Sequence, residues 1–517
     1  MRRHRIPALL LACAAIPVAI ATGCDGGDDG GDDVEVGPAA AVPRNTPLYL
    51  DATVKPTGSA EEDAKAALGK VLDTDDPGAK IVDLIEDEAK SDGHPIDFQR
   101  DLAPWLGEKA GVFFTDLAGD TVEGTAVVET TDPAAALALA RKSTGATAAN
   151  PAPQTYNGVS YQADPSEQDQ VFGTVGNFLV EGDEAGFKAA VDAQDEDSLG
   201  DSDDFKDAID ELPDDRLGTF YAIPENLLGS LGTDEIDPSS QALLEKSAGD
   251  ALEKPVAGDL SASADSFDLD LTGGDTGFDT PESSLIGEVP AQSWLALGIG
   301  DLGQIAKQTI DQLKDAGIPD FESGLSQVEQ ATGSSIDQLT DALGDAALYV
   351  QGTTESTLTG ALVIQANDPD LTGRLLNQLQ SLVQLGSSGV RPLQLSGGGS
   401  GFQINDPSVA PAAVEIAQQG DKLVIGYGER SAERTLTPAE TLADSQIFSS
   451  AKGQVSDLGT DFFLDFPSVF QLAESGGANS DSDYVEAKPY LDALRYLVSG
   501  SGSKDDQTEV KAVLGLK

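Results

Sequence analysis

The strongest constraint on this chain is an internal repeat, because one series of short motifs occurs twice in the same order. GTAVVETTDPAAALALARK starts at residue 124, and GALVIQANDPDLTGRLLNQ starts at residue 360. Each reads as an apolar strand, an Asp-Pro pair and an amphipathic helix. Asp132 and Asp368 suit the N-cap, and the proline after each suits the first helical position. The two blocks therefore predict the same strand, cap and helix twice.

Four further pairs of segments extend the repeat along the chain. They are LGEKAGVFF (from 106) and LGDAALYV (from 343), GNFLVEG (176) and GDKLVIG (420), SLGDSDDFKDA (198) and TLADSQIFSSA (441), and LGTFYAIP (217) and LGTDFFLDFP (458). All the pairs lie 236 to 244 residues apart. Chance does not give so many matches in one order. We therefore predict two homologous lobes, residues 47–273 and 289–517, joined by a linker at 274–288.

Within each copy, short apolar segments separated by polar turns alternate with helical patterns. GVFFTDLAGDTVEGTAVVETT, for example, reads as two strands joined by a polar turn. Hairpins of this kind build antiparallel sheets, whereas parallel strands need long crossover connections. We therefore predict the α+β fold class, with each lobe a largely antiparallel sheet of hairpins covered by helices on one side.

The first residues predict export and lipid attachment. A group of arginines precedes the apolar run IPALLLACAAIPVAIA, which is too short for a membrane-spanning helix and is typical of a signal peptide. The run ends in Ala-Thr-Gly-Cys, which resembles a bacterial lipobox. We predict a lipoprotein signal peptide at 1–23, lipidation of Cys24 and a flexible acidic tether at 24–46. An ordinary secretory signal with an incidental cysteine is the alternative. The body is expected outside the cytoplasm, anchored to the cell membrane by Cys24.

The composition excludes several classes of function. The chain has 89 acidic and 31 basic residues, a formal net charge of −58, which excludes nucleic acid as a partner and disfavours anionic lipid surfaces. After removal of the signal peptide, the chain keeps one cysteine, Cys24, and one histidine, His94. Zinc sites are built from several Cys and His ligands, so none is expected. His94 lies in the turn SDGHPIDF and is interpreted as a solvated loop residue, not a catalytic one.

One segment, WLALGIGDLGQIAKQTIDQL at 294–313, has the G-x-G-x-x-G spacing of a dinucleotide-binding loop. The corresponding segment of the first copy, PLYLDATVKPTGSAEEDAKAAL, keeps the strand and the helix but lacks the glycine pattern. The acidic residue expected about twenty positions later does not follow a second parallel strand. Asp301 would also place a negative charge beside the pyrophosphate. We interpret the segment as a tight strand-to-helix turn and expect no nucleotide cofactor.

Other candidate sites are equally weak. Aspartate-rich segments at 73–78, 195–204 and 479–486 do not complete the pattern of a calcium loop, so they are interpreted as solvated loops and helix caps, and no metal site is predicted. Trp105 and Trp294 adjoin apolar runs and are interpreted as core residues. No catalytic residue is assigned, because so many carboxylates make any one pair uninformative.

The lipobox at Cys24, the acidic tether, the opening PRNTPLYLDATVKP and the duplicated body together resemble a family of uncharacterised bacterial envelope lipoproteins, domain of unknown function 3352. The resemblance covers nearly the whole mature chain. It implies an exported, anchored protein, and it supplies no activity and no functional residues.

Two classes of function stay open. The favoured one is a non-enzymatic surface lipoprotein, a binding or scaffold module, and one version of it carries an apolar ligand. The other is a carboxylate-only extracytoplasmic hydrolase acting on glycans, with two carboxylates roughly 5–9.5 Å apart in a cleft. The expected partners are the membrane, through the acyl anchor, and an unknown ligand or envelope protein.

Overall fold

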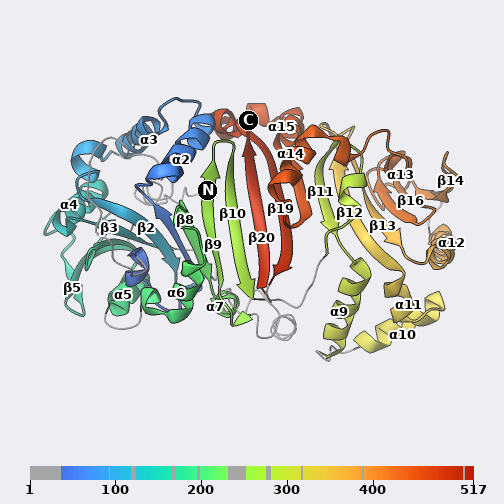
Figure 1. The fold of residues 1–517 in the computed structure, drawn as a ribbon, viewed down its shortest axis with the longest axis horizontal. Coiled ribbons are helices and arrows are strands. Elements are labelled where there is room, and N and C mark those ends of the chain that lie inside the picture. The colour runs from blue at the N-terminus through green and yellow to red at the C-terminus, as the bar shows by residue number, and fades with distance from the viewer. Residues whose placement is uncertain are drawn as a thin grey trace. The chain divides into compact units, whose positions relative to one another are not determined.

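The computed structural model describes residues 37–91, 93–117, 124–165, 167, 169–194, 198–230, 252–274, 281–315, 318, 320–386, 389–504 and 507–517. Cys24, the predicted signal peptide at 1–23 and residues 24–36 of the predicted tether lie outside the described residues. The chain divides into two compact units (Figure 1): unit 1 is Met1–Pro238 with Gly249–Gly274, and unit 2 is Ser239–Ala248 with Asp275–Lys517.

The strands of unit 1 pair antiparallel throughout. Their order is β4-β5-β6-β7-β3-β2-β1-β8-β9-β10. The bounds are β1 Leu48–Thr53, β2 Leu106–Phe114, β3 Gly124–Thr130, β4 Gln154–Tyr156, β5 Val159–Ala163, β6 Gln170–Val175, β7 Phe178–Asp183, β8 Gly218–Ala222, β9 Val256–Ser263 and β10 Ser266–Gly274. The predicted α+β class with a largely antiparallel sheet is confirmed.

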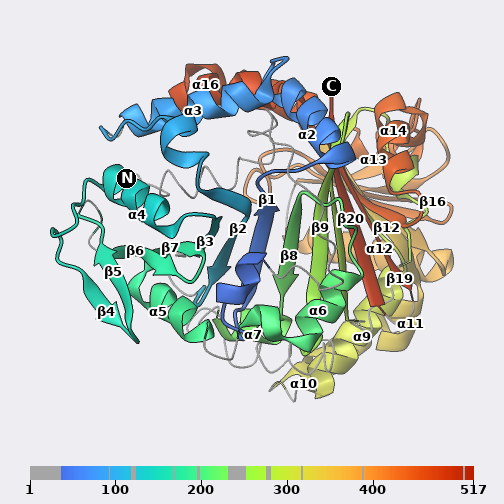
Figure 2. The same ribbon diagram turned by 60° about the vertical axis from the view of Figure 1, so that its left-hand side comes forward.

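Helices cover both faces of this sheet. They are α2 Gly58–Val71, α3 Pro77–Ser91, α4 Pro133–Thr144, α5 Glu184–Ala193, α6 Asp203–Asp210 and α7 Pro224–Ser230, with the short turns η1 Gly37–Ala41, η2 Phe98–Leu102 and η3 Leu199–Asp201. On the first face, η1, α5 and α6 pack around Tyr49, Phe113 and Tyr221. On the second face, η2 and α4 pack against Leu179. Figure 2 shows α4 and α5 on opposite sides of β6 and β7.

Unit 2 repeats the strand order of unit 1, with every strand number raised by ten. Its antiparallel order is β14-β15-β16-β17-β13-β12-β11-β18-β19-β20. The bounds are β11 Ser293–Ile299, β12 Leu343–Gln351, β13 Thr359–Ala366, β14 Val390–Gln394, β15 Ser400–Ile404, β16 Val414–Gln419, β17 Lys422–Tyr427, β18 Gly459–Asp465, β19 Leu494–Lys504 and β20 Gln507–Leu516.

The helices of unit 2 are α9 Leu302–Asp315, α10 Phe321–Thr332, α11 Ile336–Asp341, α12 Pro369–Gly386, α13 Ser431–Leu436, α14 Gln446–Gln454, α15 Phe466–Ser475 and α16 Ser482–Leu491, with the short turns η5 Ile286–Glu288, η6 Leu442–Asp444 and η7 Ala478–Ser480. The first face is again buried: η5, α13 and α14 pack around Ala296, Tyr349 and Phe463.

Local details recur at matching places in the two units. Asp132 accepts the backbone N–H groups of Ala134 and Ala135 at the start of α4. Asp368 accepts the N–H of Leu371 at the start of α12, so both predicted caps are confirmed. On the first faces, Phe205 meets Tyr221 edge-on at 5.0 Å between ring centroids. In the same way, Phe448 meets Phe463 at 5.2 Å.

Three parts of the predicted domain organisation and layering are wrong. Residues 37–46, assigned to the tether, begin unit 1: Ala39, Ala41 and Val42 are fully buried on its first face, because small apolar side chains fit there. Residues 281–288, assigned to the linker, likewise bury Leu285 and Ile286 in unit 2. Helices were predicted on one side of each sheet, but in unit 1 they cover both faces. The reason is that the strands of unit 1 carry apolar side chains on both faces.

Candidate functional site

The second face of unit 1 is closed by large side chains from η2 and the residues after it. Phe98, Leu102 and Trp105 are at most 2% exposed and pack with Leu139 of α4 and Leu179 of β7. The indole N–H of Trp105 donates to the carbonyl oxygen of Asp101 at 2.7 Å, which fixes the ring. The prediction that Trp105 is a core residue is confirmed.

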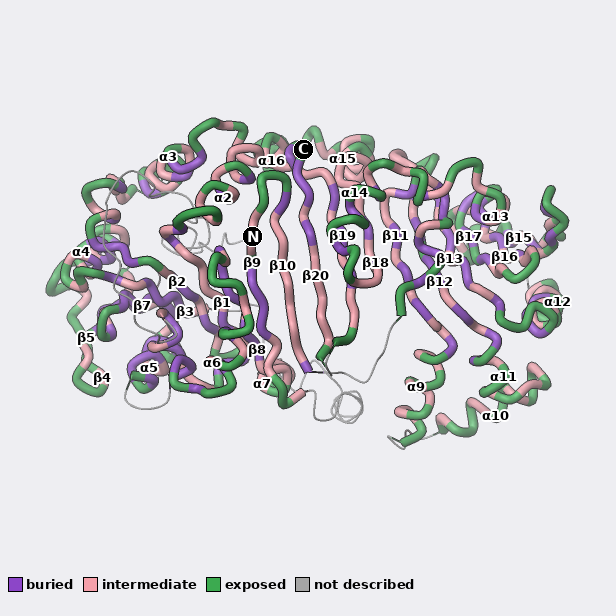
Figure 3. The backbone as a smooth tube through the Cα atoms, viewed as in Figure 1, coloured by how far each residue is buried: buried purple, intermediate pink, exposed green. Residues whose placement is uncertain are grey.

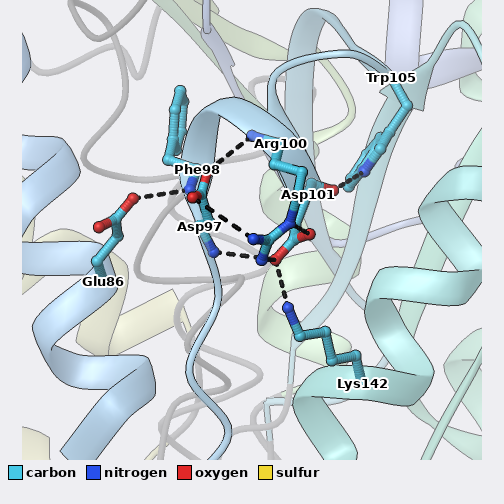
Figure 4. Close-up of polar contacts among 7 residues, drawn as sticks. All are labelled: Glu86, Asp97, Phe98, Arg100, Asp101, Trp105 and Lys142. Carbon is cyan, nitrogen blue, oxygen red and sulfur yellow. Dashed lines mark hydrogen bonds and ion pairs between the residues drawn. The ribbon is translucent and has the colours of Figure 1, made fainter.

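A polar cluster holds η2 against the helices on either side (Figure 4). The Arg100 guanidinium donates to both carboxylate oxygens of Asp101, at 2.7 and 2.8 Å, and Lys142 of α4 also contacts this carboxylate. The backbone N–H of Phe98 donates to Glu86 of α3 at 2.8 Å. The hydrogen bond from Arg100 is the main reason that the pKa of Asp101 lies well below its usual range. The cluster therefore links α3, η2 and α4, which together cover this face.

The same face of unit 2 is apolar but only partly covered. We define the open face as the second-face side chains of β11, β12, β13 and β17. They are Leu295, Leu297, Ile299, Ala346, Leu348, Val350, Leu362, Ile364, Leu423, Ile425 and Tyr427. A cross-strand row, Leu297–Leu348–Leu362–Ile425, runs through the middle of it.

None of these side chains is charged, although the chain carries a net charge of −58. Leu348 is 37% exposed, Ile425 41% and Tyr427 36%. Figure 3 shows buried residues alternating with partly exposed ones along β11, β12 and β13. Unit 1 has a corresponding cross-strand row. At the position of Ile425 this row has Glu181, which is only 8% exposed.

The open face results from a local difference between the two copies. Residues 96–107 read IDFQRDLAPWLG, whereas residues 336–344 read IDQLTDALG, so unit 2 has glutamine where unit 1 has Phe98 and has no counterpart of Trp105. The helices of this region in unit 2 bury few residues: α9 buries only Gly303, and α10 buries none of its residues. Without counterparts of Phe98 and Trp105, this region leaves part of the face uncovered. Part of the face is covered: Ala346 and Ile364 are buried, and at its margin Leu376 of α12 packs on Phe402 of β15.

The glycines of the G-x-G-x-x-G segment have a packing role. A Cβ at Gly300 would lie 1.8 Å from the carbonyl oxygen of Pro281, and one at Gly303 would lie 2.3 Å from that of Thr340. Between β11 and α9, Asp301 adopts a left-handed conformation, and its N–H donates to the Asp345 carboxylate. Because β11 pairs antiparallel with β12 and β18, the predicted strand-to-helix turn is confirmed and no βαβ unit is formed here.

The remaining sequence candidates lie apart from the open face or at its end. His94 follows α3 in unit 1 and is half-buried, with its ring beside Gly145. Trp294 is half-buried at a β-bulge and is not part of the core cluster of unit 2, so its prediction as a core residue is wrong; its indole N–H donates to the carbonyl oxygen of Gly352 at 2.9 Å. In the acidic segments, Asp76 and Asp481 cap α3 and α16, as predicted. Within the described residues, no group of acidic, histidine or cysteine side chains is arranged to hold a metal ion.

Comparison with known proteins identifies the family. Residues 29–516 match the family described as protein of unknown function DUF3352. The chain belongs to this family. Membership of this family, inferred from the sequence, is thereby confirmed, and the family description assigns no activity to this DUF3352 member.

Other comparisons add no functional information. No curated protein matches the chain. Crystal forms I and IV of TP0453 match at 9% and 10% identity, covering 78% and 77% of this chain and 97% and 94% of the other, with TM-scores of 0.15 and 0.17. Likeness at this level carries no argument. In the described part of the chain, no helix has both the length and the apolar character needed to cross a membrane.

Proposed function

We propose that this DUF3352 member is an exported, lipid-anchored envelope protein that binds an apolar or amphipathic small molecule on the open face of unit 2. The supporting observation is the uncharged row Leu297–Leu348–Leu362–Ile425 across paired strands, two of whose members are more than one-third exposed. With neighbouring strands about 4.8 Å apart, this row extends over roughly 14 Å. Contiguous apolar surfaces of this kind mark binding sites.

Ligand burial on this face supplies useful free energy. Full burial of a leucine or isoleucine side chain is worth about 1.5–3 kcal/mol. Leu348 and Ile425 are each about two-fifths exposed, so covering them contributes about 1 kcal/mol each. The partly exposed neighbours on adjacent strands add to this sum.

The anchor and the duplication complete the proposal. Cys24 carries the acyl anchor, and the acidic tether holds the body outside the cytoplasm. The identical strand orders support an origin of both units from one ancestral lobe. In the lobe that became unit 1, η2 and Trp105 filled the face; the lobe that became unit 2 kept it free for a ligand.

The glycan-hydrolase alternative gains no support from Glu181 or Glu433. A general acid needs a carboxyl of raised pKa in a cleft. Glu181, whose pKa is raised to about 7, lies buried in unit 1. Glu433 lines a cleft in unit 2, but hydrogen bonds from Ser396 and Arg430 lower its pKa.

Titration with N-phenyl-1-naphthylamine, a neutral apolar fluorophore, tests the proposal on the mature chain with Cys24→Ser. Leu348→Glu and Ile425→Glu should each weaken binding at least tenfold, because a carboxylate on this face must be desolvated beneath the ligand. Leu84→Glu is the matched control, since Leu84 is 40% exposed on α3 of unit 1. Equal binding by all four proteins, or none by the wild type, would refute the proposal.

A further inference from the structure

A large cleft lies in unit 2 where β12 and β17 end and β11 begins. Its volume is about 1420 Å³. The loop after β12, including Gly352 and Thr357, forms one wall, and the turn from β17 into α13 forms another. A second hollow of about 410 Å³ shares Gly352 and Thr357 with it. Together they provide room for a ligand group of several rings.

Tyr427 belongs to the open face and also lines the cleft, whereas Gln351 and Thr359 line the cleft from the first face of the sheet. Tyr427 lies two residues after Ile425 on β17, so both side chains point to the same side of the strand. Tyr427 is 36% exposed. A molecule on the open face that covers both Ile425 and Tyr427 would therefore contact one residue of the cleft.

Several neutral hydrogen-bonding residues line the cleft. The amide side chains Gln292 and Asn405 line it from separate segments of the chain, together with Thr357, whose hydroxyl is hydrogen-bonded to Thr354. Thr359 also lines it; its hydroxyl oxygen is buried and has no hydrogen-bond partner among the groups that the structure describes. An unsatisfied buried hydroxyl is costly, so a ligand hydroxyl that pairs with it is favoured.

The charges around the cleft select against an anionic ligand. Four glutamates and two arginines line it. One arginine, Arg430, is already paired with Glu433 at 3.1 Å. The lining therefore has an excess of negative charge, which repels carboxylate and phosphate groups. A neutral group rich in hydroxyls can both donate to and accept from the amides and can stack on Tyr427.

We propose that this cleft binds the neutral, polyhydroxylated head group, a sugar or polyol, of an amphiphile whose apolar part lies on the open face. This inference rests on the proposed function and names the class of ligand. A head group in the cleft and a tail on the row through Ile425 would use both surfaces at once.

Trp294 provides a local reporter of the cleft. Its indole N–H donates to the carbonyl oxygen of Gly352, and Gly352 lines both the cleft and the second hollow. The other tryptophan, Trp105, is 1% exposed in unit 1. A spectrum of the Trp294→Phe variant, subtracted from that of the wild type, isolates the signal of Trp294.

The experiment compares dodecyl amphiphiles that share one tail, each below its micelle concentration, on the mature chain with Cys24→Ser. Dodecyl maltoside should bind at least tenfold more tightly than dodecanoate or dodecyltrimethylammonium, and it should change the Trp294 signal. Gln292→Ala with Asn405→Ala should remove this preference while leaving the binding of N-phenyl-1-naphthylamine unchanged. Leu348→Glu should weaken both kinds of binding.

Three outcomes concerning the head group would overturn the inference. They are equal affinity for the three head groups, a preference for either charged one, and an undiminished maltoside preference in the double variant. Maltose without a tail distinguishes a free sugar from an amphiphile: if it binds as tightly as dodecyl maltoside, the ligand is not an amphiphile. In each case retained fluorophore binding would leave the proposed function standing, whereas its loss in the wild type would refute the proposed function itself.

Discussion

Glu181 on β7 offers a quantitative test of how unit 1 is packed. It occupies the position of Ile425 in the repeat and is 8% exposed. Burial, followed by the charges of Asp164 and Glu167, raises its pKa from 4.5 to about 7. The folded state therefore holds the proton to higher pH than the unfolded state does. Its contribution to stability is complete below pH 4.5 and is lost as the pH rises through 7.

The size of this effect follows from the two pKa values. One pKa unit corresponds to about 1.36 kcal/mol, so the free energy of unfolding of unit 1 should fall by about 3 kcal/mol across this window because of Glu181 alone. Glu181→Gln removes the titration but keeps the shape of the side chain. The stability of this variant relative to the wild type should therefore rise by about 3 kcal/mol between pH 4.5 and pH 8.

Urea unfolding followed by Trp105 fluorescence, in a Trp294→Phe background, measures this difference in unit 1. Glu225→Gln on α7 is the control, because Glu225 is exposed in the same unit. Its pH profile should match that of the wild type. If the difference between Glu181→Gln and the wild type is the same at both pH values, then burial of this carboxyl does not set its titration and the reasoning is wrong.

Other substitutions test the remaining packing arguments. Gly303→Ala should destabilise unit 2 by about 1–3 kcal/mol because its Cβ would meet the backbone of Thr340, whereas Gly324→Ala on α10 has open space and should stabilise by about 0.5–1 kcal/mol. Urea unfolding measures both, and reversed signs would contradict the close approach. Trp105→Ala should cost unit 1 about 3–5 kcal/mol in thermal unfolding, and a loss below about 1 kcal/mol would be inconsistent with a core position. Asp101→Asn should cost about 1–3 kcal/mol at pH 7. Since the folded pKa of Asp101 is depressed from 3.8, the advantage of the wild type is present above pH 3.8 and should shrink as the pH falls toward the folded value; a pH-independent difference would argue against the Arg100 interaction.

The sequence predicts local structure well in this chain because short-range chemistry determines it. The side chains of Asp132 and Asp368 reach only to the next helical turn, so their roles can be inferred from the spacing of Asp, Pro and the apolar residues. The turn at Asp301 was predictable for the same reason. The additional packing role of Gly300 and Gly303 was not, because their neighbours, Pro281 and Thr340, come from other parts of unit 2.

The candidate site was not found from the sequence, although a signal was present. The strand segments LALGI, AALYV, ALVI and LVIGY in unit 2 are nearly continuous apolar runs, and such runs are typical of strands covered on both faces. Whether a helix covers the second face depends on large side chains elsewhere. Comparison of Phe98 and Trp105 with the segment around Gln338 shows which copy lacks them. Aligning the repeats position by position, rather than motif by motif, would have indicated the open face.

The acidity of the chain and the open face are physically related. An exposed apolar surface promotes self-association, and two copies that met through this face would have to bring two strongly negative bodies together. At physiological ionic strength the Debye length is about 8 Å, so this repulsion acts at the short separations that such a contact needs. A neutral amphiphile experiences no such repulsion. The net charge thus opposes occupation of the face by a second copy or by an anionic ligand, while leaving it accessible to an uncharged one.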